Sequence, residues 1–281
     1  MEPHLEQIRE QQKQSWNKFS GGWKKWDEIV MDFLKPMGDE IIRLINPKTT
    51  DYILDIASGT GEPGLTIAAK LTDGKIILTD LADDMLKIAR ENAALRGIKN
   101  VQTMTCDVCE LPFPDNTFDA ISCRFGFMFF PDMELAAKEM VRVLKPGGRI
   151  ATAVWNGPEK NFWITATMGT ISRNLELPPP PSGSPGMFRC AKDGFISDLF
   201  TKAGLKNIVQ TEVAGKLNCK TVDGYWEMQT EVAAPIVAAL GSTTDEIREK
   251  IKKETYIIVN EKFPDGNVII DSSAWVIYGE K

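Results

Sequence analysis

The chain has 281 residues, 43% of them hydrophobic, which is enough to build the packed core of one large α/β domain or two smaller ones. The formal net charge of -6 argues against nucleic acid as a partner, because phosphate neutralisation requires a strongly basic face. Residues 1–14 are polar and charged, and no apolar run approaches the roughly 20 residues that span a bilayer. We therefore expect a cytoplasmic protein with no membrane span.

Residues 4–45 are predicted to be helical, because apolar side chains recur there at the spacing of helical turns, and Gly21-Gly22 is expected to break or bend the helix. From residue 52 to residue 155, short β-rich segments alternate with helical patterns. This alternation is typical of a parallel sheet covered by helices on both faces. The β-rich segments are residues 52–56, 75–79, 100–106, 118–123 and 149–154.

The pattern is less regular beyond residue 156. Prolines and small residues over 178–186 predict an extended connector. The remaining elements expected are a helix at 192–203, a strand at 206–217, two helices within 221–263 and a final strand at 268–278.

The five cysteines are an odd number in a long chain, which favours reduced thiols. Cys106 and Cys109 form the single Cys-x-x-Cys pair, and the sole histidine, His4, lies near the start of the chain. A structural metal site needs more ligands than this, so we predict no metal.

A β-rich segment at 53–56 runs into a glycine-rich turn at 57–64 and then into a helical pattern. Glycines let the backbone approach a ligand closely, and Pro63 suits the first turn of the following helix. A cofactor therefore fits against this turn. The Gly-x-Gly-x-x-Gly spacing does not choose the cofactor by itself, because nicotinamide and flavin proteins share it.

Two acidic residues narrow the choice of cofactor. Asp80 follows the second β-rich segment, where a carboxylate can accept hydrogen bonds from both ribose hydroxyls of an adenosine group. Asp55 lies four residues before Gly59, and a carboxylate there would repel the pyrophosphate of a dinucleotide. The same carboxylate would tolerate the cationic, phosphate-free methionine half of S-adenosylmethionine.

Four sequence blocks occur at a characteristic spacing: LDIASGTG at 54–61, TD at 79–80, CDVCELPFPDNTFD at 106–119 and VLKPGG at 143–148. Together they resemble the class I S-adenosylmethionine-dependent methyltransferases. Within that class they are similar to the type 11 group, which includes the ubiquinone and menaquinone biosynthesis C-methyltransferases. The resemblance covers residues from about 51 to 155.

The resemblance implies an α/β fold with a Rossmann-like, seven-stranded, mostly parallel sheet, helices on both faces and an antiparallel last strand. It also implies a division of the chain into a helical lid at 1–50, a cofactor-binding core at 51–156 and the remainder of the same domain at 157–281. Within that remainder, residues 221–263 separate the last two strands. We expect this insert to cover the acceptor pocket together with the amino-terminal helices.

The resemblance also assigns roles around a bound S-adenosylmethionine. It places one group of residues at the methionine half, one at the adenosine half and one beside the sulfonium. These are Asp55, Ala57, Ser58, Gly59 and Gly61 for methionine; Asp80 for ribose, with Leu81, Asp107 and Val108 for adenine; and Cys123 and Arg124 for the sulfonium side.

Aromatic and apolar residues suggest an acceptor pocket, although simple core packing is the alternative for each of them. The candidates are Trp16, Phe19, Trp23, Phe127 and Met128. The chain departs from the quinone enzymes of the type 11 group at Met128-Phe129, where those enzymes carry Arg-Asn. It also lacks their histidine in the segment 20–26.

These observations predict in-line transfer of a methyl group from S-adenosylmethionine to a small, partly apolar acceptor, with S-adenosylhomocysteine as product. They identify no catalytic base and leave both the methylated atom and a homodimer open. Two alternatives are a nicotinamide-dependent oxidoreductase and a non-catalytic S-adenosylmethionine-binding module.

Overall fold

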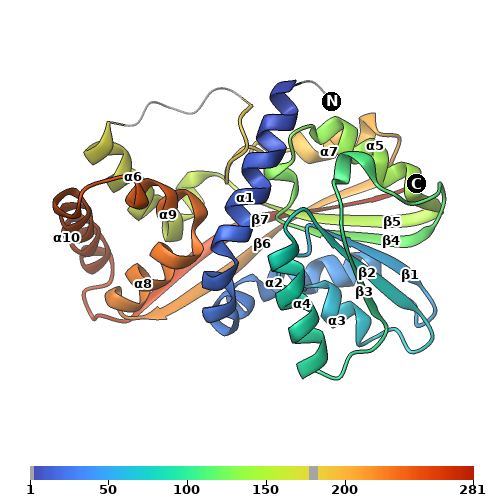
Figure 1. Ribbon diagram of the computed structural model, residues 1–281, viewed down its shortest axis with the longest axis horizontal. Helices are drawn as coiled ribbons and strands as arrows, with labels where there is room; N and C mark the ends of the chain where they lie inside the picture. Colours follow the sequence, from blue (N-terminus) through green and yellow to red (C-terminus); the bar gives the residue numbers. More distant parts are fainter. Residues whose placement is uncertain (1–2, 177–182) are drawn as a thin grey trace.

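In the computed structural model, which describes residues 3–176 and 183–281, seven strands form one sheet (Figure 1). The strand order is β3-β2-β1-β4-β5-β7-β6. The strands are β1 Tyr52–Ile56, β2 Lys75–Asp80, β3 Val101–Thr105, β4 Phe118–Arg124, β5 Leu144–Trp155, β6 Lys206–Lys220 and β7 Val268–Glu280.

The pairs among β1 to β5 are parallel, whereas β7 runs antiparallel to both of its neighbours, β5 and β6. The predicted Rossmann-like sheet with an antiparallel last strand is therefore confirmed. β1 lies between β2 and β4, so the strand order reverses at this point. In open α/β sheets, ligands bind beyond the carboxyl ends of the strands where the order reverses. The topology thus positions a candidate site beyond β1 and β4.

The burial of the strands follows from the helices around them. Ile53, Leu54 and Ile121 in the central strands are fully buried, as expected where helices cover both faces of a parallel sheet. The edge strand β6 instead alternates between exposed and buried residues toward its end, with Leu217 and Cys219 facing inward.

Helices α2, α3 and α4 cover one face of the sheet, and α5 and α7 cover the other (Figure 1). Helices α6, α8, α9 and α10 gather at the far ends of β6 and β7. Among the described residues, no helix is long and apolar enough to cross a bilayer. The helices are α1 Pro3–Lys25, α2 Asp27–Ile45, α3 Gly64–Ala68, α4 Asp83–Leu95, α5 Met133–Val143, α6 Phe162–Leu175, α7 Phe195–Lys202, α8 Val222–Val232, α9 Ala234–Gly241 and α10 Asp245–Lys262.

Local capping explains where several helices begin. The Asp132 side chain accepts a hydrogen bond from the backbone N–H of Leu135 at 2.9 Å, at the start of α5. The Thr244 hydroxyl accepts one from Ile247 at 3.3 Å, at the start of α10. At the other end of α4, Gly97 has a φ of 67°, a conformation that ends helices and favours glycine.

The helices differ from the predictions at three places. The amino-terminal helix passes through Gly21-Gly22 and breaks instead at Trp26, between α1 and α2. The segment 221–263 forms three helices, not two. The third difference is α6, which no expected helix matches, because its buried face includes Thr167 and Thr170 and so lacks a clear apolar repeat. The connector expected at 178–186 lies mostly outside the described residues.

Helix α1 lies between α4, which covers the sheet, and α8, which belongs to the insert (Figure 1). Lys24 pairs with Glu91 of α4 at 2.6 Å, and Lys25 pairs with Glu231 of α8 at 2.7 Å. The Trp26 indole N–H also donates to Glu231, at 2.7 Å. The helix therefore contacts both parts of the chain that border the candidate site.

The backbones of α1 and α8 approach each other closely at Gly22. A Cβ at Gly22 would lie 2.0 Å from the carbonyl oxygen of Glu231, whereas a Cβ at Gly21 would meet no atom within 4 Å. We expect Gly22→Ala to lower the free energy of unfolding by about 1–3 kcal/mol, because the added methyl group meets rigid backbone. Gly21→Ala should raise it by about 1 kcal/mol, since alanine favours helix. Urea denaturation measures both, and equal shifts would contradict the docking of α1 on α8.

Candidate functional site

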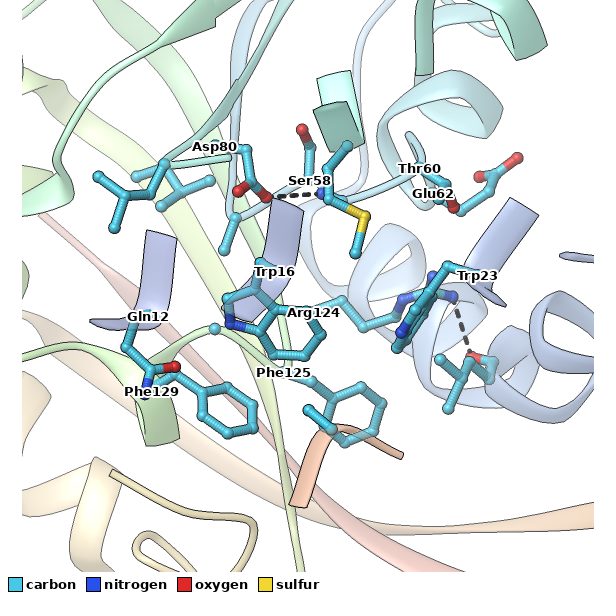
Figure 2. Close-up of a pocket in the computed structure, with 18 of the residues that line it drawn as sticks. Gln12, Trp16, Trp23, Ser58, Thr60, Glu62, Asp80, Arg124, Phe125 and Phe129 are labelled. Carbon is cyan, nitrogen blue, oxygen red and sulfur yellow. Dashed lines mark hydrogen bonds between the residues drawn. The ribbon is translucent and has the colours of Figure 1, made fainter. Parts of the chain in front are cut away.

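A cleft opens beyond the carboxyl ends of β1, β2 and β4, with residues of α1 along one wall (Figure 2). It encloses about 1480 Å³ when its open mouth is counted.

The loop after β1 forms part of the cleft wall. Ala57, Ser58 and Gly59 line the cleft, and Ala57 and Gly59 each have a φ of 53°. A Cβ at Gly59 would meet no atom within 4 Å, so nothing in the protein fills the space on that side. Gly61 does not line the cleft; a Cβ there would lie 2.7 Å from the Leu65 side chain, so glycine lets the loop close onto α3.

Asp80 ends β2 and faces the cleft (Figure 2). Its Oδ2 accepts a hydrogen bond from the backbone N–H of Gly59 and its Oδ1 accepts one from Ala82, both at 2.9 Å. Burial raises the pKa of Asp80, although these N–H groups act to lower it. Each carboxylate oxygen can accept a further hydrogen bond, so the pair can receive two neighbouring hydroxyl groups.

Asp107 provides a second carboxylate on the wall next to Asp80. Its Oδ1 accepts a hydrogen bond from the backbone N–H of Cys109 at 2.8 Å, which caps a short 3₁₀ turn, η1 (Val108–Glu110). Its Oδ2 lies 3.5 Å from Arg9 Nη1 of α1. A carboxylate beside a flat apolar wall fits both the amino edge and the face of an adenine ring. The apolar residues of this wall are Leu81, Met85 and Val108.

The cysteines do not supply a reactive thiolate to the cleft. Cys106 lines it, but burial and the nearby Asp107 raise the pKa of this thiol to about 12, so it is protonated at neutral pH. All five cysteines of the chain are unpaired. Over residues 3–176 and 183–281, no group of three potential ligands could hold a metal ion.

Asp55 lies behind the loop and does not line the cleft. It is fully buried; its Oδ1 accepts a hydrogen bond from the Ser122 hydroxyl at 2.5 Å, and its Oδ2 has no partner in the protein. Burial raises the pKa of Asp55 to about 7, despite the opposing effects of Ser122 and Arg124. Asp55 therefore cannot contact a ligand in the cleft directly, and it could affect ligand binding only by holding the loop in place.

Cys123 and Arg124 are neighbours at the end of β4 but lie in different surroundings. Cys123 is fully buried in the core and does not line the cleft. A Cβ on Gly126 would lie 2.7 Å from its sulfur, so the chain after β4 packs tightly over it. Arg124 does line the cleft (Figure 2).

The residues predicted for an acceptor pocket separate in the same way. Trp16 and Trp23 of α1 line the cleft (Figure 2). Phe19, Phe127 and Met128 do not line it and are buried in the core. These three residues therefore pack in the core, which was the alternative interpretation of the sequence pattern.

The cleft also contains an aromatic cluster whose four rings the sequence pattern did not predict as one group. Phe125 stacks on Trp155, with ring centroids 4.2 Å apart, and Trp155 lies 4.9 Å from Trp163. Phe33 of α2 stacks on Trp155 from 5.6 Å. Three of the rings belong to α2, β5 and α6, and Phe125 directly follows β4, so no local sequence signal marks the four as one group. Helices α8 and α9 complete this apolar side with Met228, Val232, Ala233, Ala234 and Pro235.

Residues 25–163 match the model of the ubiE/COQ5 methyltransferase family. This segment belongs to that family. It contains the loop at 57–59, Asp80 and Asp107, whereas α8 and α9 lie beyond it. The ubiE/COQ5 segment thus includes the loop, both carboxylates and the aromatic cluster of the cleft, and α8 and α9 outside it complete the apolar side.

Curated relatives from the ubiE/COQ5 group match the same region. The demethylmenaquinone methyltransferase of Thermus thermophilus is 37% identical over 140 residues, which cover 50% of this chain and 53% of that protein. The ubiquinone/menaquinone biosynthesis C-methyltransferase UbiE of Teredinibacter turnerae is 40% identical over 123 residues, covering 43% and 49%. The chain therefore spans about half the length of the curated relatives it matches.

Several solved structures share the fold of this chain at low sequence identity. The YcgJ protein from Bacillus subtilis has a TM-score of 0.57 at 20% identity, over 87% of this chain and 97% of that one. The [4+2]-cyclase SpnF has a TM-score of 0.54 at 19% identity, over 87% and 79%. Because a protein described as a cyclase has this fold, the reaction must be argued from the site.

Proposed function

We propose that this protein is an S-adenosylmethionine-dependent methyltransferase acting on a small, partly apolar organic acceptor. The main support is a single cleft in which Asp80, Asp107 and the loop at 57–59 face the same space. These residues lie within the segment that belongs to the ubiE/COQ5 methyltransferase family. The relatives' names support the same class of reaction.

The residues present fit S-adenosylmethionine better than a dinucleotide. Asp80 would bind the ribose hydroxyls, and Asp107 with the neighbouring apolar wall would bind adenine. A pyrophosphate would instead need the start of α3, and a carboxylate already lies there: Asp55 Oδ2 is 2.7 Å from where a Cβ on Gly64 would be. The pKa of Asp55 is about 7, so this carboxyl is partly ionised at neutral pH, and its charge would act against a phosphate at this point.

The bound cofactor would supply a methyl group activated by a sulfonium for in-line displacement by the acceptor. The chain's own part is to align the acceptor and exclude water. Trp16 and Phe129, with ring centroids 5.2 Å apart, narrow the cleft between α1 and the chain after β4. Helices α8 and α9 limit access on the apolar side.

The cleft supports an acceptor whose nucleophilic atom needs no histidine, lysine or tyrosine as a base. Among the described residues that line it, none is histidine, lysine or tyrosine, and the thiol of Cys106 is protonated at neutral pH. We therefore propose a phenol, amine, thiol or activated carbon on an apolar framework. The relatives are named for quinone precursors, but they match only half of this chain, so that acceptor is one candidate among these.

Ligand-dependent melting tests the proposal. S-adenosylmethionine and S-adenosylhomocysteine are expected to raise the melting temperature and NAD⁺ to leave it unchanged, because a ligand that binds the folded state stabilises it. Incubation with S-adenosylmethionine and a panel of quinols, phenols, amines and thiols should then yield S-adenosylhomocysteine with one class. A rise with NAD⁺ alone would favour a nicotinamide-dependent oxidoreductase. Binding without turnover across the panel would favour a non-catalytic module.

A further inference from the structure

Arg124 places a cation at one end of the cleft. Its side chain extends from the end of β4 toward Trp23, on the opposite side from Gln12 (Figure 2). Its guanidinium contacts two uncharged acceptors: Nη1 donates to the carbonyl oxygen of Leu34 at 3.4 Å, and Nη2 lies 3.3 Å from the Met31 sulfur. These contacts orient the side chain without neutralising its charge.

The guanidinium has no close carboxylate. Within the described parts of the chain, no Asp or Glu oxygen lies within 4.0 Å of it. Glu62, Asp55 and Asp27 act on Arg124 only from farther away, and Glu62 is paired with Arg96. A cation removed from water is normally paired, because its desolvation is unfavourable. The site therefore has a place for an anion that the protein does not provide.

Trp23 adds a second donor at the same end of the cleft (Figure 2). Its indole N–H is buried and has no hydrogen-bond partner in the protein. A buried donor without a partner is unfavourable, because it has lost its hydrogen bonds to water. A ligand oxygen would satisfy this donor.

We infer that Arg124 and the indole N–H of Trp23 bind the α-carboxylate of the cofactor's amino-acid tail, an inference that rests on the proposed function. Asp80 and Asp107 make the adenosine end of the cleft anionic. Glu62 also lines the cleft, but its carboxylate pairs with Arg96, so Arg124 is the cation of the described lining that is left for the ligand's carboxylate. A guanidinium beside the sulfonium would repel it. Arg124 is therefore assigned to the carboxylate and not to the sulfonium side that the sequence resemblance implied.

Paired ligands test this assignment by calorimetry. S-adenosylhomocysteine carries the amino-acid tail, whereas 5′-methylthioadenosine has the same adenosine and thioether without it. The wild-type protein is expected to prefer S-adenosylhomocysteine. Arg124→Met should weaken S-adenosylhomocysteine by about 10- to 100-fold, as for a lost charge-assisted hydrogen bond, and leave 5′-methylthioadenosine unchanged. Arg124→Lys should recover part of the loss, and Trp23→Phe should lower the preference by a smaller factor.

Binding of 5′-methylthioadenosine also reports that each variant is folded. If Arg124→Met weakens both ligands equally, or leaves their ratio unchanged, the assignment is wrong. If the wild-type protein binds both ligands equally well, the assignment is again wrong, but the proposed function stands. If it binds neither ligand, the proposed function itself fails.

Discussion

Replacing Asp80 with asparagine is expected to weaken the binding of S-adenosylhomocysteine by about 100-fold, because two charge-assisted hydrogen bonds to the ribose lose their charge. Asparagine also replaces one of the two carboxylate oxygens by an NH₂ group, which is a donor and cannot accept a hydrogen bond. Gly59 and Ala82 donate to the two carboxylate oxygens, so the amide cannot satisfy both. Isothermal titration calorimetry measures the loss of affinity.

Asp84→Asn is the matched control for Asp80. Asp84 lies in the first turn of α4, is exposed to solvent and does not line the cleft. The same change of charge there should leave the affinity within about twofold, since an exposed charge outside the site is screened by solvent. Equal losses in both variants would show that the net charge of the protein, not the contact at Asp80, sets the affinity.

We expect Asp55→Asn to make the protein more stable than the wild type at pH 8, by on the order of a few kcal/mol. Burial raises the pKa of Asp55 to about 7. The stability contributed by its neutral form is therefore fully present below the unfolded pKa, near 4, and is lost as the pH rises through about 7. The difference between variant and wild type should grow across this window and level off above it. Urea denaturation from pH 4 to pH 8 measures it.

Asp119→Asn supplies a control of opposite sign. Burial acts to raise the pKa of Asp119, but Lys145 and the backbone N–H of Tyr52 outweigh it, and the net shift is downward. Its ionised form therefore stabilises the fold at neutral pH, and the contribution is lost only as the pH falls through the lowered pKa. This variant should be less stable than the wild type at pH 8. A stability difference for Asp55→Asn that does not change between pH 4 and pH 8 would refute the buried ionisation.

The sequence predicted that the loop at 57–59, Asp80 and Asp107 face one cleft, because the signals for them are local. The loop at 57–59 needs residues that tolerate a positive φ or a close approach, and Asp80 directly ends a strand. Both features follow from a few neighbouring residues, so one short motif marks each of them. Asp107 follows the next strand in the same way.

The aromatic side could not be predicted in the same way. Phe33, Phe125, Trp155 and Trp163 meet only after α2, β4, β5 and α6 are packed, so each looks like a core residue in the sequence. The reverse error occurred at Phe127 and Met128, since the turn η2 (Phe127–Phe129) directs both into the core.

Asp55 shows a limit of another kind. Its position before the glycine-rich loop indicated a role near the ligand, but side chains alternate between the two faces of a strand. The face that Asp55 occupies turns it under α3, where it meets Ser122 of the neighbouring strand. Which face a strand residue occupies depends on the register and packing of the whole sheet.

Strands β6 and β7 pair from Lys206 opposite Glu280 to Lys220 opposite Val268, although residues 221–267 separate them in the chain. Helices α8, α9 and α10 lie between the two strands in the sequence but take no part in their pairing. The hydrogen bonding of the sheet therefore does not depend on the residues that connect the two strands. Residues 221–267 can therefore change in sequence or length without altering the strand order, and with them the apolar side of the cleft would change. The proposed nucleoside site at β1 and β2 would keep its position.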